Sequence, residues 1–116
     1  MKQNICNPIF PLNEYVPDGE PHAFGSRVYL YGSHDAANSS RFCVKDYTVW
    51  SAPVNDLTDW TNHGVTYRKE QDPRSRDGKL ADLYASDCVR GNDGRYEELC
   101  IEVKGGKLDI LSFALE

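Results

Sequence analysis

Residues 27–33 read RVYLYGS, a run rich in β-branched and aromatic side chains that alternate in size, which is typical of a β-strand. Similar runs lie on both sides of it, at residues 21–24, 47–52 and 64–67. Turn-favouring segments separate these runs, namely Gly25-Ser26, the polar loop 34–40, and the stretch 56–60 after Pro53. Short strands at this spacing predict one antiparallel sheet over residues 21–67.

The pattern restarts after a charged loop at residues 68–79 that contains glycine and proline. Residues 83–89 read LYASDCV and precede a turn at 92–94 and then Arg95-Tyr96. Two alternating runs, 101–104 and 107–110, flank a pair of glycines and predict a hairpin, although residues 108–115 are equally compatible with a helical turn. The weak repetition is of the kind that radial β architectures show. We therefore predict an all-β fold with a second, incomplete antiparallel sheet over residues 83–115.

Composition and charge exclude several classes of partner. The 116 residues suffice for one domain at most, and 13 Lys and Arg against 18 Asp and Glu give a net charge of −5. This balance argues against a nucleic-acid surface and against binding to an anionic membrane, and no apolar run approaches the ~20 residues that cross a bilayer. The first residues lack the apolar core of a secretory signal, so we expect a cytoplasmic protein; secretion followed by removal of a leader is the alternative.

The cysteines and histidines do not have the spacing of metal ligands. They are Cys6, Cys43, Cys88 and Cys100, and His22, His34 and His63. The cysteines form no Cys-x-x-Cys pair, and we expect them to be free thiols with a packing role. We predict no metal and no cofactor.

Two aspartates stand out as candidates for chemistry. Asp18 lies in the segment PDGE, in which proline fixes φ and glycine accepts a positive φ, so the residues alone favour a turn. Asp87 lies inside an apolar segment, where an unpaired carboxylate is costly. It is therefore either at a strand end that faces a cleft or paired with a cation such as Arg90. Several aromatic residues could stack on sugar rings, although core packing is their more frequent role: Tyr29, Tyr31, Trp50 and Trp60.

Taken in order, several segments resemble the N-terminal part of glycoside hydrolase family 43. They are residues 7–12 (NPIFPL), 17–22 (PDGEPH), 28–35 (VYLYGSHD), 50–53 (WSAP), 71–74 (QDPR) and 83–87 (LYASD), and the resemblance ends near residue 96. Members of this family are five-bladed β-propellers that include β-xylosidases, α-L-arabinofuranosidases and arabinanases. Because a blade takes ~40–50 residues, the resemblance implies a partial propeller. Residues 1–116 would form a single truncated domain, with one blade over about 16–67 and an incomplete one over about 83–115.

The resemblance assigns roles to both aspartates. Asp18 matches the first-blade aspartate, the general base that activates water in an inverting hydrolysis. Asp87 matches the second-blade aspartate of an Ala-Pro-Asp-Val motif, which modulates the pKa of the general acid; here Ser86 and Cys88 replace the proline and the valine. The implied activity is hydrolysis of O-glycosyl bonds in polysaccharides that contain arabinose or xylose, and the implied partner is a carbohydrate.

The family's general acid, a third-blade glutamate, has no recognisable counterpart, since Glu97, Glu98 and Glu102 lie where the resemblance has ended. We therefore expect the chain on its own to be inactive. The alternative is a non-catalytic fragment or small β-module that binds carbohydrate weakly. A partial propeller also leaves an open sheet edge, through which we expect self-association.

Overall fold

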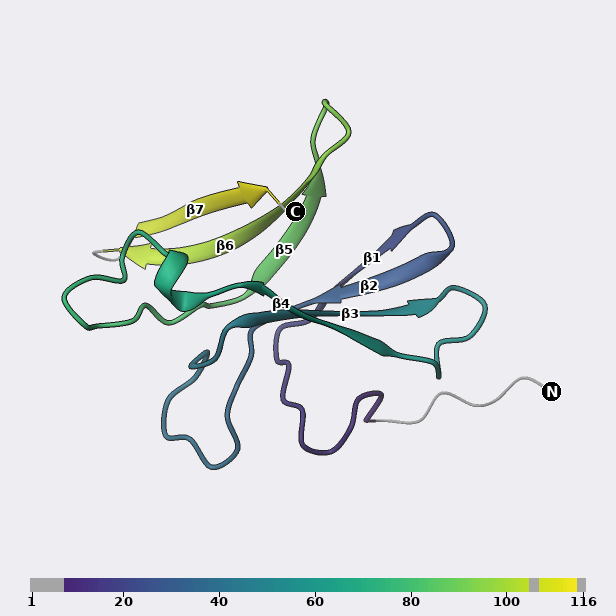
Figure 1. The fold of residues 1–116 in the computed structure, drawn as a ribbon, viewed down its shortest axis with the longest axis horizontal. Coiled ribbons are helices and arrows are strands. Elements are labelled where there is room, and N and C mark those ends of the chain that lie inside the picture. The colour runs from purple at the N-terminus through teal and green to yellow at the C-terminus, as the bar shows by residue number, and fades with distance from the viewer. Residues whose placement is uncertain (1–7, 105–106, 115–116) are drawn as a thin grey trace.

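The protein is described by a computed structural model that covers residues 8–104 and 107–114, with side chains up to residue 99. Its first sheet contains strands β1 (Glu20–Phe24), β2 (Arg27–Tyr31), β3 (Tyr47–Pro53) and β4 (Thr61–Tyr67). Each strand pairs antiparallel with the next one along the chain, in the order β1-β2-β3-β4 (Figure 1). A tight turn joins β1 to β2, and Gly25 adopts the left-handed φ of 60° that this turn requires.

The second sheet contains β5 (Ser86–Arg90), β6 (Tyr96–Lys104) and β7 (Lys107–Ala114), again antiparallel and in chain order. The predicted hairpin is confirmed, because β6 and β7 pair from Glu97 with Ala114 to Lys104 with Lys107. The helical alternative for residues 108–115 is wrong as far as residue 114, since alternation of apolar residues here extends a strand. Leu115 lies outside the described residues.

The all-β prediction is confirmed. Within the described ranges, the regular helical structure is one 3₁₀ turn, η1 (Lys69–Gln71), in the loop after β4. No helix in that part of the chain is long and apolar enough to cross a membrane. The predicted strand at 83–89 was placed too early, since β5 begins at Ser86. Leu83 is instead fully buried against Tyr47 and Tyr67, and its N–H donates to the carbonyl of Cys43 at 3.2 Å.

The two sheets meet along their first strands, because β5 contacts both β1 and β2 (Figure 1). The core between them contains Tyr31 and Val49 from the first sheet and Cys88 from the second. Phe24 of β1 packs on Tyr96 of β6 with ring centroids 4.6 Å apart. Consecutive antiparallel sheets with neighbouring first strands are compatible with two adjacent propeller blades.

Two of the four aromatic residues considered for stacking on sugars instead pack in the core, which was predicted as their more frequent role. Tyr31 and Trp50 are both buried. Phe10 stacks on Trp50 at 4.6 Å and meets Trp60 edge-on at 5.2 Å, so these rings fasten the segment before β1 to the first sheet. Tyr29 and Trp60 are half-buried.

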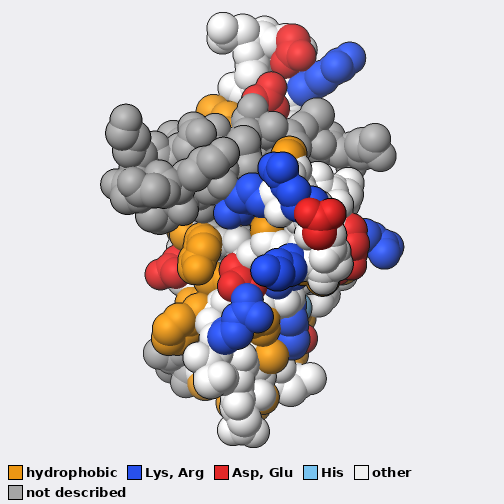
Figure 2. Space-filling view, turned by 90° about the vertical axis from the view of Figure 1, so that its left-hand side faces the viewer, with side chains coloured by type: hydrophobic (Ala, Val, Ile, Leu, Met, Phe, Trp, Pro, Cys, Tyr) orange, Lys and Arg blue, Asp and Glu red, His pale blue; other side chains and the backbone are white. Residues whose placement is uncertain are grey.

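Figure 2 faces the side on which the loop after β4 lies and shows Lys and Arg side chains interspersed with Asp and Glu. Several cations of this loop and its neighbours form ion pairs. Asp82 accepts from Arg41 at 2.5 Å and from the buried Lys69 at 3.0 Å, and Asp72 accepts from Arg74 at 2.6 Å. These cations therefore anchor the loop and do not form a free basic patch.

Candidate functional site

Asp18 lies on a bend two residues before β1 and is exposed. Its φ of 54° is in the left-handed region, which aspartate tolerates better than most residues but at a cost. The bend packs against Gly32 at the end of β2, where a Cβ atom would lie 2.7 Å from Val16 Cγ1 and 3.0 Å from the Pro17 carbonyl oxygen. The missing side chain of Gly32 thus allows the Asp18 bend to rest on β2.

The Asp18 carboxylate has no hydrogen bond or ion pair to any other described residue. It lies within electrostatic range of the Cys43 thiol. Burial is the main cause that raises the pKa of Cys43; the nearby Ser33 hydroxyl opposes the shift, and the negative charges of Asp35 and Asp18 add to it. An exposed carboxylate without a partner among the described residues is available to accept a proton from water or a hydrogen bond from a ligand.

Asp87 is the second residue of β5, so it lies at a strand end, and it is also paired. The pairing with Arg90 is wrong: the Arg90 guanidinium lies over the Tyr96 ring, 5.9 Å from its centroid. The partner is His22 on β1, whose Nε2 lies 2.5 Å from Asp87 Oδ1. The backbone N–H of Cys88 donates to the same oxygen at 2.6 Å.

Asp87 therefore lies where the first strands of the two sheets meet, and Asp18 lies two residues before the first of these strands. Asp18 precedes β1, and Asp87 contacts that same strand through His22, four residues after Asp18. The spacing of His22 does not fit a metal ligand, and nothing else around it in the sequence predicts this pairing. No local pattern could have revealed it, because His22 and Asp87 are 65 positions apart.

Of the glutamates that follow Asp87, Glu98 is enclosed in the core. Glu98 is fully buried and pairs across the strands with Cys88, whose side chain lies in the core between the sheets. Burial raises the pKa of Glu98 to about 7, against the opposing influence of the nearby Thr66 and Ser86 hydroxyls. Neither hydroxyl reaches hydrogen-bond geometry, so both carboxylate oxygens lack a partner among the described residues.

Glu97 is half-buried and is the register partner of Val89, one position along β6 from Glu98. Its side chain therefore points to the face of the sheet opposite to Glu98. The side chain of Glu102 lies outside the described residues.

The other histidines and the cysteines have structural surroundings. His34 Nδ1 lies 3.1 Å from the Asp46 carbonyl oxygen and its Nε2 3.1 Å from Glu14, and His63 Nε2 lies 2.5 Å from Ser51 Oγ. Cys43 and Cys88 are buried free thiols, as predicted, whereas Cys6 and the side chain of Cys100 lie outside the described residues. In the part of the chain described here, no three His, Cys, Asp or Glu side chains are grouped as metal ligands.

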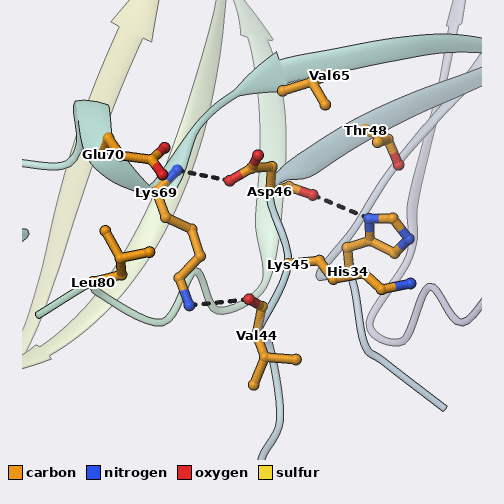
Figure 3. A pocket seen from close by; sticks show the side chains of 9 residues that line it. All are labelled: His34, Val44, Lys45, Asp46, Thr48, Val65, Lys69, Glu70 and Leu80. Atoms are coloured by element: carbon orange, nitrogen blue, oxygen red, sulfur yellow. Dashed lines mark hydrogen bonds between the residues drawn. The ribbon is translucent and has the colours of Figure 1, made fainter.

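A pocket of about 410 Å³ lies elsewhere, between the β3–β4 face and the following loop (Figure 3). Its lining residues are His34, Val44, Lys45, Asp46, Thr48, Val65, Lys69, Glu70 and Leu80. Lys69 already has hydrogen-bond partners there, since its Nζ donates to the Val44 carbonyl and its backbone N–H donates to Asp46. Neither Asp18 nor Asp87 lines this pocket, so it is separate from the candidate site.

No protein-family model matches the sequence. Over 96 residues, which are 83% of this chain, it is 52% identical to a protein of Thermoclostridium stercorarium named "Xylosidase/arabinosidase". The chain spans only 20% of the length of that relative. Identity of this size shows that the two sequences are homologous over the matched stretch.

Proposed function

We propose that this chain is part of a glycoside hydrolase resembling family 43, which hydrolyses O-glycosyl bonds in arabinose- or xylose-containing polysaccharides with inversion. The observation that carries the proposal is the homology to the protein named xylosidase/arabinosidase. The architecture supports it, because a propeller brings the first strands of its blades together around one axial site. Both candidate aspartates lie near such strands.

In this proposal Asp18 is the general base. Inverting hydrolysis needs a carboxylate that takes a proton from water while the water attacks the anomeric carbon. Asp18 has the required properties, since it is exposed and its carboxylate has no described protein partner. Its left-handed backbone is held in place by the packing of the bend on Gly32. Backbone strain of this kind costs ~1–3 kcal/mol and concentrates at functional sites.

Asp87 would modulate the general acid. A carboxylate next to a second carboxyl group disfavours ionisation of that group and keeps it protonated near neutral pH. Asp87 is half-exposed and fixed through one oxygen, so its charge is presented at a defined position. Inverting enzymes separate base and acid by ~6.5–9.5 Å to leave room for water, which is compatible with carboxyl groups supplied by different blades.

The general acid itself is not supplied by the described residues at this site. Glu98 is fully buried in the core and cannot reach a glycosidic oxygen. General acid catalysis contributes ~10²–10⁴-fold, so we expect the isolated chain to have negligible glycosidase activity. This observation favours a second candidate for the chain on its own, a small β-module that binds pentoses weakly without cleaving them.

The test combines binding with turnover. We expect xylose and L-arabinose to shift NMR signals of residues 17–22 and 84–88, and Asp18→Ala and Asp87→Ala to weaken that binding. Signals that stay unchanged at saturating sugar, or that shift only around the separate pocket, would contradict the proposed site.

The second arm assays nitrophenyl arabinofuranoside and xyloside with the purified chain and with Asp18→Ala. Equal, background-level rates are the expected result. Turnover that disappears in Asp18→Ala would overturn the expected inactivity and would support Asp18 as the base.

A further inference from the structure

The hydrogen bond between His22 and Asp87 joins the two sheets at the candidate site. The His22 side chain extends from β1 and that of Asp87 from β5, and their relative exposures are 32% and 48%. An ionised carboxylate has no proton to donate, so the proton of this bond belongs to His22 Nε2. Nε2–H therefore donates to Asp87 Oδ1 over 2.5 Å.

The imidazole is held in this orientation by its neighbours. It stacks on Phe24 with an interplanar angle of 3° and ring centroids 5.7 Å apart, and it meets Tyr31 at 63° with centroids 6.3 Å apart. Phe24 packs in turn on Tyr96 of the second sheet, and Tyr31 is buried in the shared core. His22 is thus fixed by aromatic packing before any ligand binds, as an orienting residue has to be.

Both hydrogen bonds to Asp87 converge on one of its oxygens. Oδ1 accepts from His22 Nε2 and from the backbone N–H of Cys88. Oδ2 has no hydrogen bond to another described residue. Two donors on Oδ1 fix the plane of the carboxylate, and the half-exposed side chain leaves Oδ2 available to a ligand.

We propose that His22 is a positioning residue that anchors Asp87 Oδ1 and thereby presents Oδ2 to the hydroxyl groups of a bound pentose. This inference rests on the proposed function for the identity of the ligand. The positioning itself rests on the hydrogen bond and the packing of the imidazole. The positioning of Asp87 by His22 and the binding of a pentose can therefore be contradicted separately.

The first arm of the test measures the side-chain rotamer of Asp87 by three-bond NMR couplings, without sugar. We expect a single rotamer in the wild-type chain, averaging in His22→Ala, and recovery in His22→Gln, which restores an N–H donor. His63→Ala is the matched control, because His63 is bonded to Ser51 on the first sheet and should not affect Asp87. An unchanged Asp87 rotamer in a folded His22→Ala chain would overturn the inference whatever the sugar does.

The second arm titrates the same variants with xylose and L-arabinose. Loss of one hydrogen bond to a charged group should weaken binding about tenfold in His22→Ala, with recovery in His22→Gln. Equal affinity in wild type and His22→Ala would overturn the inference while leaving the proposed function intact. Absence of sugar binding in every chain, together with rotamer averaging in His22→Ala, would count against the proposed function and uphold the positioning of Asp87.

Discussion

Glu98 has surroundings that are unusual for a glutamate. It is a carboxylic acid with no exposed surface, enclosed between the sheets beside Cys88. Burying an unpaired charge is costly, so the protonated form is the one that the core accommodates. A group of this kind makes the stability of the fold depend on pH.

We expect stability to fall as pH rises from about 4.5 to about 7, the ordinary and the folded pKa of Glu98. In that window the unfolded chain releases the proton while the folded chain retains it. The loss is roughly 3 kcal/mol at pH 8, at 1.36 kcal/mol for each pKa unit. Urea unfolding at pH 4, below this window, and at pH 8 measures it.

Glu98→Gln should remove most of this pH dependence and should be more stable than wild type at pH 8. Glu97→Gln, one position along β6 and half-buried, is the matched control and should retain the wild-type dependence. Parallel pH profiles for wild type and Glu98→Gln would show that Glu98 has the same pKa in the folded and the unfolded chain, and would contradict this prediction.

At the scale of single elements, alternation in the sequence predicted strands well and strand ends less well. The run at 27–33 and the pair of glycines at 105–106 indicated β2 and the β6–β7 hairpin, because local side-chain patterns determine these. The start of β5 was misplaced because Leu83 looks like a strand residue but packs on Tyr47. The site shows the same limit, since the exposed bend at Asp18 is local whereas the contact of His22 with Asp87 depends on sheet packing.

The bend before β1 provides a prediction at this scale. Gly32→Ala places a Cβ atom against Val16 and the backbone of Pro17, so the Asp18 bend has to move away from β2. We expect a loss of ~1–3 kcal/mol in urea unfolding and weaker pentose binding. In the control, Gly91→Ala, the new Cβ meets mainly the Asp93 carboxylate, a side-chain end that can shift, and the cost should be smaller. Equal effects of the two substitutions would contradict a specific role for Gly32.

For the whole molecule, the feature that matters is the outer edge of the first sheet. Within the described residues β4 pairs only with β3, and its sequence, TNHGVTY, contains no proline and no acidic, lysine or arginine side chain. Five of its seven residues are exposed, and an edge with these properties is open to pairing with another strand. By contrast, β1 carries Glu20 and Pro21.

We therefore expect the chain to self-associate in a concentration-dependent manner, measured by sedimentation equilibrium. Val65→Lys adds a charge to the edge and should shift the equilibrium towards monomer, whereas Asn92→Lys, in the exposed β5–β6 turn, should not. A wild-type chain that stays monomeric at the highest soluble concentration would refute this expectation.

The shared core has a consequence for cooperativity. Tyr31 and Val49 are buried against Cys88, and Tyr47 and Tyr67 against Leu83, so both of these core clusters combine residues from the two halves. We therefore expect the two sheets to unfold together, in a single thermal transition. The exposed turn at residues 76–79 connects the halves without contributing to these clusters. The peptide bonds within this turn are therefore not needed to form the core. Two separate fragments that meet at this turn contain the same core residues as the intact chain.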